Sequence, residues 1–174
     1  AGAIGVGYVI SFPQPDRMNG DTAFATALSY MPTVIAMFEN DNNIFPKTSG
    51  TVILGPDTSG ILSKGVIQNT EILRSNAIEA IATAPTEIDQ IVRRIPLLLQ
   101  TPDGWVSAFG TEVLKILANA DTYIIKTDEF GIQEITVQGI PPVKTDGLGR
   151  KWISWVDTPE TNLRDMNVAG KYVF

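Results

Sequence analysis

A strand–helix–strand pattern at the start of the chain constrains the fold most. β-Branched and aromatic residues predict strands over 4–11 and 33–38. Between them, Asp21 is a suitable N-cap for a helix over 22–31, which has an apolar face and ends before Pro32. Two strands joined by such a helix favour parallel pairing with a right-handed crossover.

The rest of the sequence alternates predicted strands and helices. A turn is predicted at 101–104, and an apolar stripe that begins at Trp105 predicts the clearest helix. Strands are predicted over 51–54, 91–99, 122–126, 132–138, 151–156 and 171–174, and helices within 70–83 and over 107–120. We therefore predict an α/β fold: a single domain over 1–174, truncated at both ends, with a mixed, largely parallel sheet flanked by helices.

Composition narrows the classes of function. The net charge is −6, without a basic block, which argues against nucleic acid and anionic membrane surfaces as partners. The chain has no cysteine and no histidine, so it lacks the residues of thiolate catalysis, Ser-His-Asp catalysis and the usual zinc sites. We predict no catalytic residue, no metal and no cofactor. No apolar run approaches the roughly 20 residues that span a bilayer, so any membrane segment lies outside this sequence.

Two adjacent arginines, Arg93 and Arg94, lie near the start of the apolar run 91–99. Burying a guanidinium group costs several kcal/mol unless the group is paired. The structural interpretation is that both stems lie on the core, while the charged heads reach water or a carboxylate such as Asp89.

The same arginines also suit anion recognition, because a guanidinium group binds carboxylate or phosphate in a bidentate manner. We predict that Arg94, which lies deeper in the strand, is a structural support together with Asp89. We predict that Arg93 faces a cleft with Arg150 or Trp152 and that these three residues bind a ligand.

Four segments form an ordered pattern along nearly the whole chain. They are AGAIGVGYVISFPQPDRMNGDTAFATAL (1–28), PTEIDQIVRRIPLLLQTPDGWVSAFGTEVLKI (85–116), IPPVKTDGLGRKWISW (140–155) and NVAGKYVF (167–174). Together they resemble the CHASE type-two domain, a sensing module of bacterial receptors. The chain departs from the family pattern at Val9, often aspartate in the family, at Gln90, which replaces a glycine, and at Ala108, since the family reads Pro-Ser where this chain has Ser107-Ala108.

The resemblance implies a non-catalytic sensory input domain, held outside the membrane by flanking transmembrane helices. The implied location is the periplasmic or extracellular side of a receptor in the inner or cytoplasmic membrane. The implied cytoplasmic output is an adenylate or guanylate cyclase, a diguanylate cyclase, or the histidine kinase of a two-component system. The resemblance supplies no ligand, so we expect an unknown small ligand or extracytoplasmic protein as partner.

Two other functions remain open. The chain could be a structural dimerisation module of the receptor without a small ligand, or a small hydrolase that uses carboxylates. The lack of histidine, cysteine and a nucleophile motif opposes the hydrolase. Because the family continues at both ends, we expect an unpaired sheet edge, and therefore a homodimer.

Overall fold

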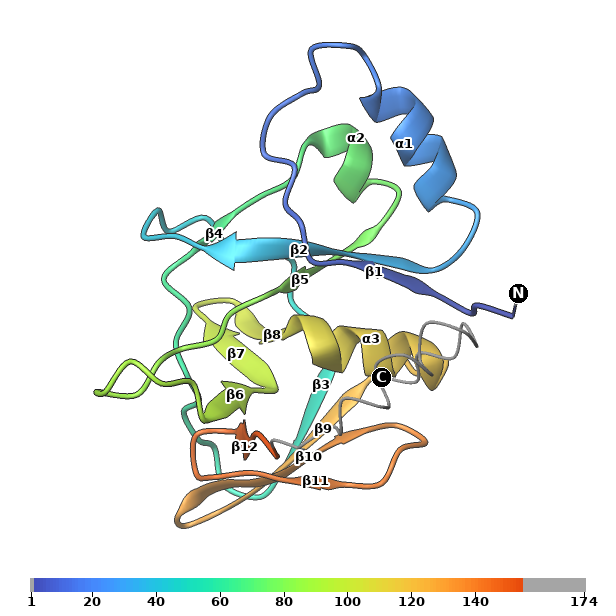
Figure 1. Cartoon of the computed structure of the whole chain (residues 1–174). Coiled ribbons are helices and arrows are strands. Elements are labelled where there is room, and N and C mark those ends of the chain that lie inside the picture. The colour runs from blue at the N-terminus through green and yellow to red at the C-terminus, as the bar shows by residue number, and fades with distance from the viewer. Residues whose placement is uncertain (1, 155–174) are drawn as a thin grey trace, which may run out of the picture.

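Strands outnumber helices in the computed structural model, which describes residues 2–154 (Figure 1). The helices α1 (Asp21–Leu28), α2 (Glu71–Arg74) and α3 (Phe109–Leu117) are short. The strands, in chain order, are β1 (Val6–Tyr8), β2 (Thr33–Glu39), β3 (Thr51–Leu54), β4 (Val66–Ile67), β5 (Ile78–Ile81), β6 (Arg94–Pro96), β7 (Leu98–Thr101), β8 (Gly104–Ser107), β9 (Tyr123–Asp128), β10 (Gly131–Val137), β11 (Val143–Lys144) and β12 (Arg150–Trp152).

The first sheet is built around β2. Strand β1 pairs with β2 in parallel, with Val6 opposite Thr33, and β5 also pairs with β2 in parallel. The short strand β4 pairs with the end of β2 in the antiparallel sense. Helices α1 and α2 lie on one side of this sheet and α3 on the other (Figure 1). The predicted parallel pairing of the first two strands is confirmed, although α1 ends earlier than predicted, at Leu28.

The second sheet has the order β11-β10-β9-β3. Strands β9 and β10 correspond to the predicted strands 122–126 and 132–138 and form an antiparallel hairpin, which β11 extends in the antiparallel sense. Strand β3 joins the other edge in parallel, with Thr51 opposite Tyr123. Two further sheets have two strands each, β6 with β12 and β7 with β8.

The predicted fold class is wrong. In place of one largely parallel sheet flanked by helices, residues 2–154 form several small mixed or antiparallel sheets with little helix. The predicted strand over 91–99 is divided into β6, which ends at Pro96, and β7, which begins at Leu98. Proline has no N–H to donate to a sheet, and each half of the run pairs with a different strand.

Two predicted helices are also shorter than expected. Within 70–83, only α2 is helical, and β5 then pairs with the buried part of β2, so tertiary pairing overrides a weak helical pattern. The helix predicted over 107–120 is confined to α3. Trp105 therefore belongs to β8, and it is buried against Gly60, where an added Cβ would lie 2.5 Å from the indole ring.

Helix α3 connects the two larger sheets. It packs against β2 and β5 of the first sheet and against β10 of the second. Three buried clusters surround these contacts, one centred on β9 and β10, one between β2, β5, β7 and β8, and one beneath α1 and α2. A group that binds at α3 is therefore in a position to affect both sheets. The predicted strand 171–174 and the end of 151–156 lie outside the described residues.

Candidate functional site

A pocket of about 520 Å³ lies beside α3, and we call it the junction pocket. Its walls come from three parts of the chain: the loop 46–50 that leads into β3, the segment 74–79 that contains the start of β5, and the residues Glu112 and Lys115 of α3. Loop 46–50 belongs with the second sheet and segment 74–79 with the first. The junction pocket is thus formed where the two sheets meet the helix between them.

Glu112 is the most buried charged group of this pocket, with 1% of its side chain exposed. Its Oε2 atom accepts hydrogen bonds from Ser107 Oγ at 2.5 Å and from Tyr123 Oη at 2.7 Å. Lys115 Nζ lies 2.7 Å from Oε1, as an ion pair without hydrogen-bond alignment. We call these four residues the glutamate cluster. Two neutral donors and one cation hold the buried carboxylate in place.

The glutamate cluster sets the protonation of Tyr123. Burial of the phenol raises its pKa, and the neighbouring carboxylate of Glu112 raises the pKa further. Tyr123 therefore remains neutral and continues to donate its hydrogen bond. The ammonium group of Lys115 also lies 5.1 Å from the centre of the Tyr123 ring, which fixes the lysine from a second side.

The mouth of the junction pocket carries further charges. Arg74 donates through Nε to Glu71 at 2.7 Å, within its own helix. Glu79 accepts two hydrogen bonds from Asn69 through Oε1. Among residues 2–154, Lys47 has no carboxylate within ion-pair distance. The pocket lining thus combines three cations with two carboxylates, Glu79 and Glu112, although the chain as a whole carries a net charge of −6.

Arg94 lies at the start of β6 and contacts two carboxylates. It donates to both oxygens of Glu87, at 2.7 and 2.8 Å, and to Asp146 Oδ2 at 3.0 Å. The ring of Trp152 lies 5.0 Å from its guanidinium carbon. Arg150 Nε donates to the same Asp146 oxygen at 2.8 Å. We call Glu87, Arg94, Asp146 and Arg150 the arginine network.

Arg93 faces a different partner. Its guanidinium forms a bidentate pair with Asp89, at 2.8 and 2.7 Å, on an exposed part of the surface. Asp89 therefore supports Arg93 rather than Arg94, contrary to the expected arrangement. The pKa of Asp89 is lowered by the hydrogen bond from Arg93 and by the backbone N–H of Ile91.

The structure thus divides the predicted site. The ring of Trp152 lies over Arg94, and Arg150 shares Asp146 with Arg94. Arg93, Arg94 and Trp152 line one shallow, open depression, and Arg150 is not part of its lining. The carboxylate partners expected for both arginines are present. The ligand-binding role of Arg93, Arg150 and Trp152 stays a prediction.

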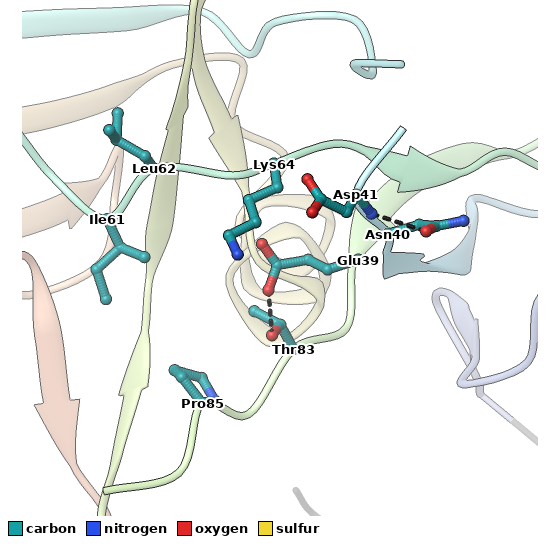
Figure 2. A pocket seen from close by; sticks show the side chains of 8 residues that line it. All are labelled: Glu39, Asn40, Asp41, Ile61, Leu62, Lys64, Thr83 and Pro85. Carbon is teal, nitrogen blue, oxygen red and sulfur yellow. Dashed lines mark hydrogen bonds between the residues drawn. The ribbon is translucent and has the colours of Figure 1, made fainter. Parts of the chain in front are cut away.

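A second pocket, of about 420 Å³, lies beyond the end of β2 (Figure 2). Figure 2 shows the side chains of Glu39, Asp41 and Lys64 near one another, with Thr83 Oγ1 donating to Glu39 at 2.6 Å. The carboxyl ends of parallel strands commonly hold ligands, and β2 and β5 both end here. These three charged side chains belong to exposed residues, however, so water weakens their attraction for a ligand more than it weakens that of the buried charges in the junction pocket.

Sequence reasoning missed Glu112, although a signal was present. Glu112 follows Phe109 by three positions and precedes Ile116 by four, so it shares the apolar face of the helix. A carboxylate on such a face is rare unless it is paired, and Lys115 follows three residues later. That combination predicts a buried ion pair.

The described part of the chain has neither a metal-binding cluster nor a membrane-spanning helix. No cluster of three or more acidic side chains there could hold a metal ion. None of the helices within residues 2–154 has the length and apolar character needed to cross a bilayer. Comparison of the chain with protein-family models, with curated proteins and with solved structures finds no match.

Proposed function

We propose that the chain is a sensory input domain of a transmembrane signalling receptor and that it binds a small ligand in the junction pocket. The observation that carries this proposal is the composition of the pocket walls. One wall leads into the second sheet, another belongs to the first, and α3 contacts both. A ligand held between these walls alters how the two sheets are connected, which is the property a sensor needs.

The ordered resemblance to the CHASE type-two domain supports the same role. It is the basis for proposing an extracytoplasmic location, a membrane-anchored parent and a cyclase or histidine kinase output. The burial of Ser107 also favours binding over catalysis. This hydroxyl lies next to Glu112, as a nucleophile would, but it is 1% exposed and already donates to the carboxylate.

One observation favours the dimerisation module as a second candidate. Among the described residues, β1 pairs with β2 alone, so its other edge has no partner strand. The nearby side chains of Ile4, Val9 and Ile10 are exposed. Exposed apolar strand edges favour pairing with a second chain. Dimerisation through β1 leaves the junction pocket open, because β1 does not line it.

A thermal-shift screen tests ligand binding. The chain is screened against carboxylates, phosphates, amines and sugars, and the melting temperature should rise with one of these classes. The matched control is Thr48→Trp, which places a bulky ring at the exposed mouth of the pocket. This variant should keep the basal melting temperature and lose the shift.

Hydrogen exchange then tests sensing. A sensor should show slower amide exchange on ligand addition in both β5 and β10, which lie in different sheets. A dimer that forms with concentration and responds to no ligand class contradicts the sensor and supports the dimerisation module. Turnover of hydrolase substrates that is lost on substitution of one Asp or Glu supports the enzyme instead.

A further inference from the structure

The junction pocket contains one cation that is held in a fixed position. Lys115 lies between the buried Glu112 carboxylate and the face of Tyr123, and 16% of its side chain is exposed. An ammonium group has three N–H donors, and the contact with Glu112 occupies the side toward the interior. Lys115 therefore offers preorganised N–H donors to a ligand in the pocket, with a charge that Glu112 already balances in part.

A second cation in the pocket lining comes from a different part of the chain. Lys47 belongs to loop 46–50, whose end is anchored by Ser49 N–H donating to the Trp105 carbonyl at 2.7 Å. Its ammonium group has no carboxylate partner among residues 2–154. Lys47 and Lys115 thus supply two separate points for negative charge, and the guanidinium of Arg74 adds a third cation to the pocket wall.

The pocket lining also contains a hydrogen-bond acceptor, the carboxylate of Glu79. Glu79 uses Oε1 to hold Asn69, and its Oε2 accepts no hydrogen bond from the described residues. A carboxylate oxygen at the wall of a polar pocket recognises a hydroxyl or ammonium group. It also disfavours a ligand that carries negative charge without such a donor.

We propose that the junction pocket binds a small dicarboxylate that carries a hydroxyl or ammonium group. Lys115 and Lys47 each bind one carboxylate, and Glu79 accepts a hydrogen bond from the donor group. The volume of about 520 Å³ lies within the range of small-molecule pockets and leaves room for a small dicarboxylate. This inference rests on the proposed function, since it names the ligand class of the same pocket.

Titration calorimetry on the whole chain tests the ligand class with malate, L-aspartate, succinate and inorganic phosphate. Malate or aspartate should bind about tenfold or more tightly than succinate, because succinate leaves Glu79 Oε2 without a donor. Preference for malate identifies a hydroxy acid, and preference for aspartate identifies an amino acid. Equal binding of succinate, or tighter binding of phosphate, overturns the assignment.

Two variants locate the binding. Lys47→Met, at an exposed position, should weaken malate and aspartate by about tenfold or more without changing the melting temperature. Glu79→Gln retains an acceptor for Asn69 and should reduce the preference for aspartate over succinate. The matched control is Lys126→Met, since Lys126 is an exposed lysine that pairs with Glu134 outside the pocket. If Lys47→Met binds like the unmodified chain, the inference fails.

The result also separates the two proposals. If none of these anions binds, but another ligand class raises the melting temperature of the chain and not of Thr48→Trp, the ligand class is wrong and the sensor proposal stands. If malate or aspartate binds through Lys47 but leaves exchange in β5 and β10 unchanged, the ligand class stands and the sensor proposal fails.

Discussion

The arginine network and the glutamate cluster hold charge in opposite ways. In the arginine network, Arg94 retains 20% exposure and has two carboxylate partners, and Asp146 has two guanidinium partners. In the glutamate cluster, one carboxylate whose side chain is only 1% exposed depends on two hydroxyl groups and a single lysine. The first arrangement is redundant and hydrated, and the second is neither.

This difference determines what each cluster can tolerate. A charge that reaches water loses little when a partner is removed, since solvent replaces the missing contact. Removal of a charge from the interior leaves its hydrogen-bond partners unsatisfied, and each unsatisfied partner lowers the free energy of unfolding. The two clusters should therefore respond unequally to comparable substitutions.

The largest expected effect is that of Glu112→Ala. The substitution leaves the hydroxyl groups of Ser107 and Tyr123 without an acceptor and Lys115 without its counter-charge. We expect the free energy of unfolding to fall by about 3 kcal/mol or more, measured by urea denaturation. Glu112→Gln is the control, and it should lose less because its amide oxygen still accepts a hydrogen bond. An alanine variant as stable as the unmodified chain would show that the cluster is not a structural element.

Tyr123→Phe should have the next largest effect. It removes one hydrogen bond to a charged group and should cost about 1.5–3 kcal/mol at neutral pH. The raised pKa of Tyr123 also predicts a pH dependence. The folded state keeps the proton while the unfolded state releases it above the ordinary pKa of 10.0, so stability is lost as pH rises beyond 10.0.

The alkaline loss is measured by urea denaturation at a series of pH values. Tyr123→Phe should lose stability less steeply above pH 10.0 than the unmodified chain does. Parallel curves for the two proteins would mean that Tyr123 ionises freely in the folded state.

Arg94→Ala and Arg93→Ala form a matched pair in the exposed region. Arg94→Ala removes the shared partner of Glu87 and Asp146 and the contact with Trp152, so the melting temperature should fall, though less than for Glu112→Ala. Arg93→Ala removes one exposed pair with Asp89 and should leave the melting temperature nearly unchanged. Calorimetric melting of both variants measures this order, and the reverse order would overturn the structural assignment of Arg94.

If the chain belongs to a receptor as proposed, and Arg93 binds a ligand as the sequence predicts, Arg93→Ala should change the output of that receptor without unfolding this domain. Unfolding of the domain by Arg93→Ala would remove the binding role and leave only structural support.

A further small effect concerns Asp146 in acid. Burial raises the pKa of this carboxyl, but hydrogen bonds from the backbone and guanidinium of Arg150 outweigh burial and lower it below 3.8. The contribution of Asp146 to stability is therefore present above pH 3.8 and lost as pH falls through the lowered pKa. In acid titrations of stability, Asp146→Asn should lack this component, and an unchanged acid profile would contradict the assignment.

The parts of the fold that follow from local patterns were predictable from the sequence. The crossover from β1 through α1 to β2 and the β9–β10 hairpin each depend on short-range periodicity and turn residues. The division of the run 91–99 depends in part on β12, which no local pattern identifies as the partner of β6, whereas β8 follows β7 directly across the predicted turn at 101–104.

The candidate sites show the same contrast between contacts that are local in the sequence and contacts that depend on the tertiary fold. The pairing of Arg93 with Asp89 spans four positions, as expected for neighbours in sequence. Arg94 binds Asp146, which lies 52 positions away, and no spacing rule connects the two. Glu112 and Lys115 were visible on one helix, but the pocket above them is formed by residues 46–50 and 74–79, which only the tertiary fold brings together.

The parallel pairing of β3 with β9 has a consequence for the order of folding. Thr51 and Tyr123 are partners in the second sheet, so a long loop must close before that edge can form. Closing a long loop costs chain entropy before any contact is gained, and non-local pairing of this kind slows folding. The β9–β10 hairpin can form early by itself, whereas β3 must wait for the chain between them to be placed. Since loop 46–50 leads directly into β3, we expect the junction pocket to be completed at a late stage of folding, after α3 and the hairpin are in position.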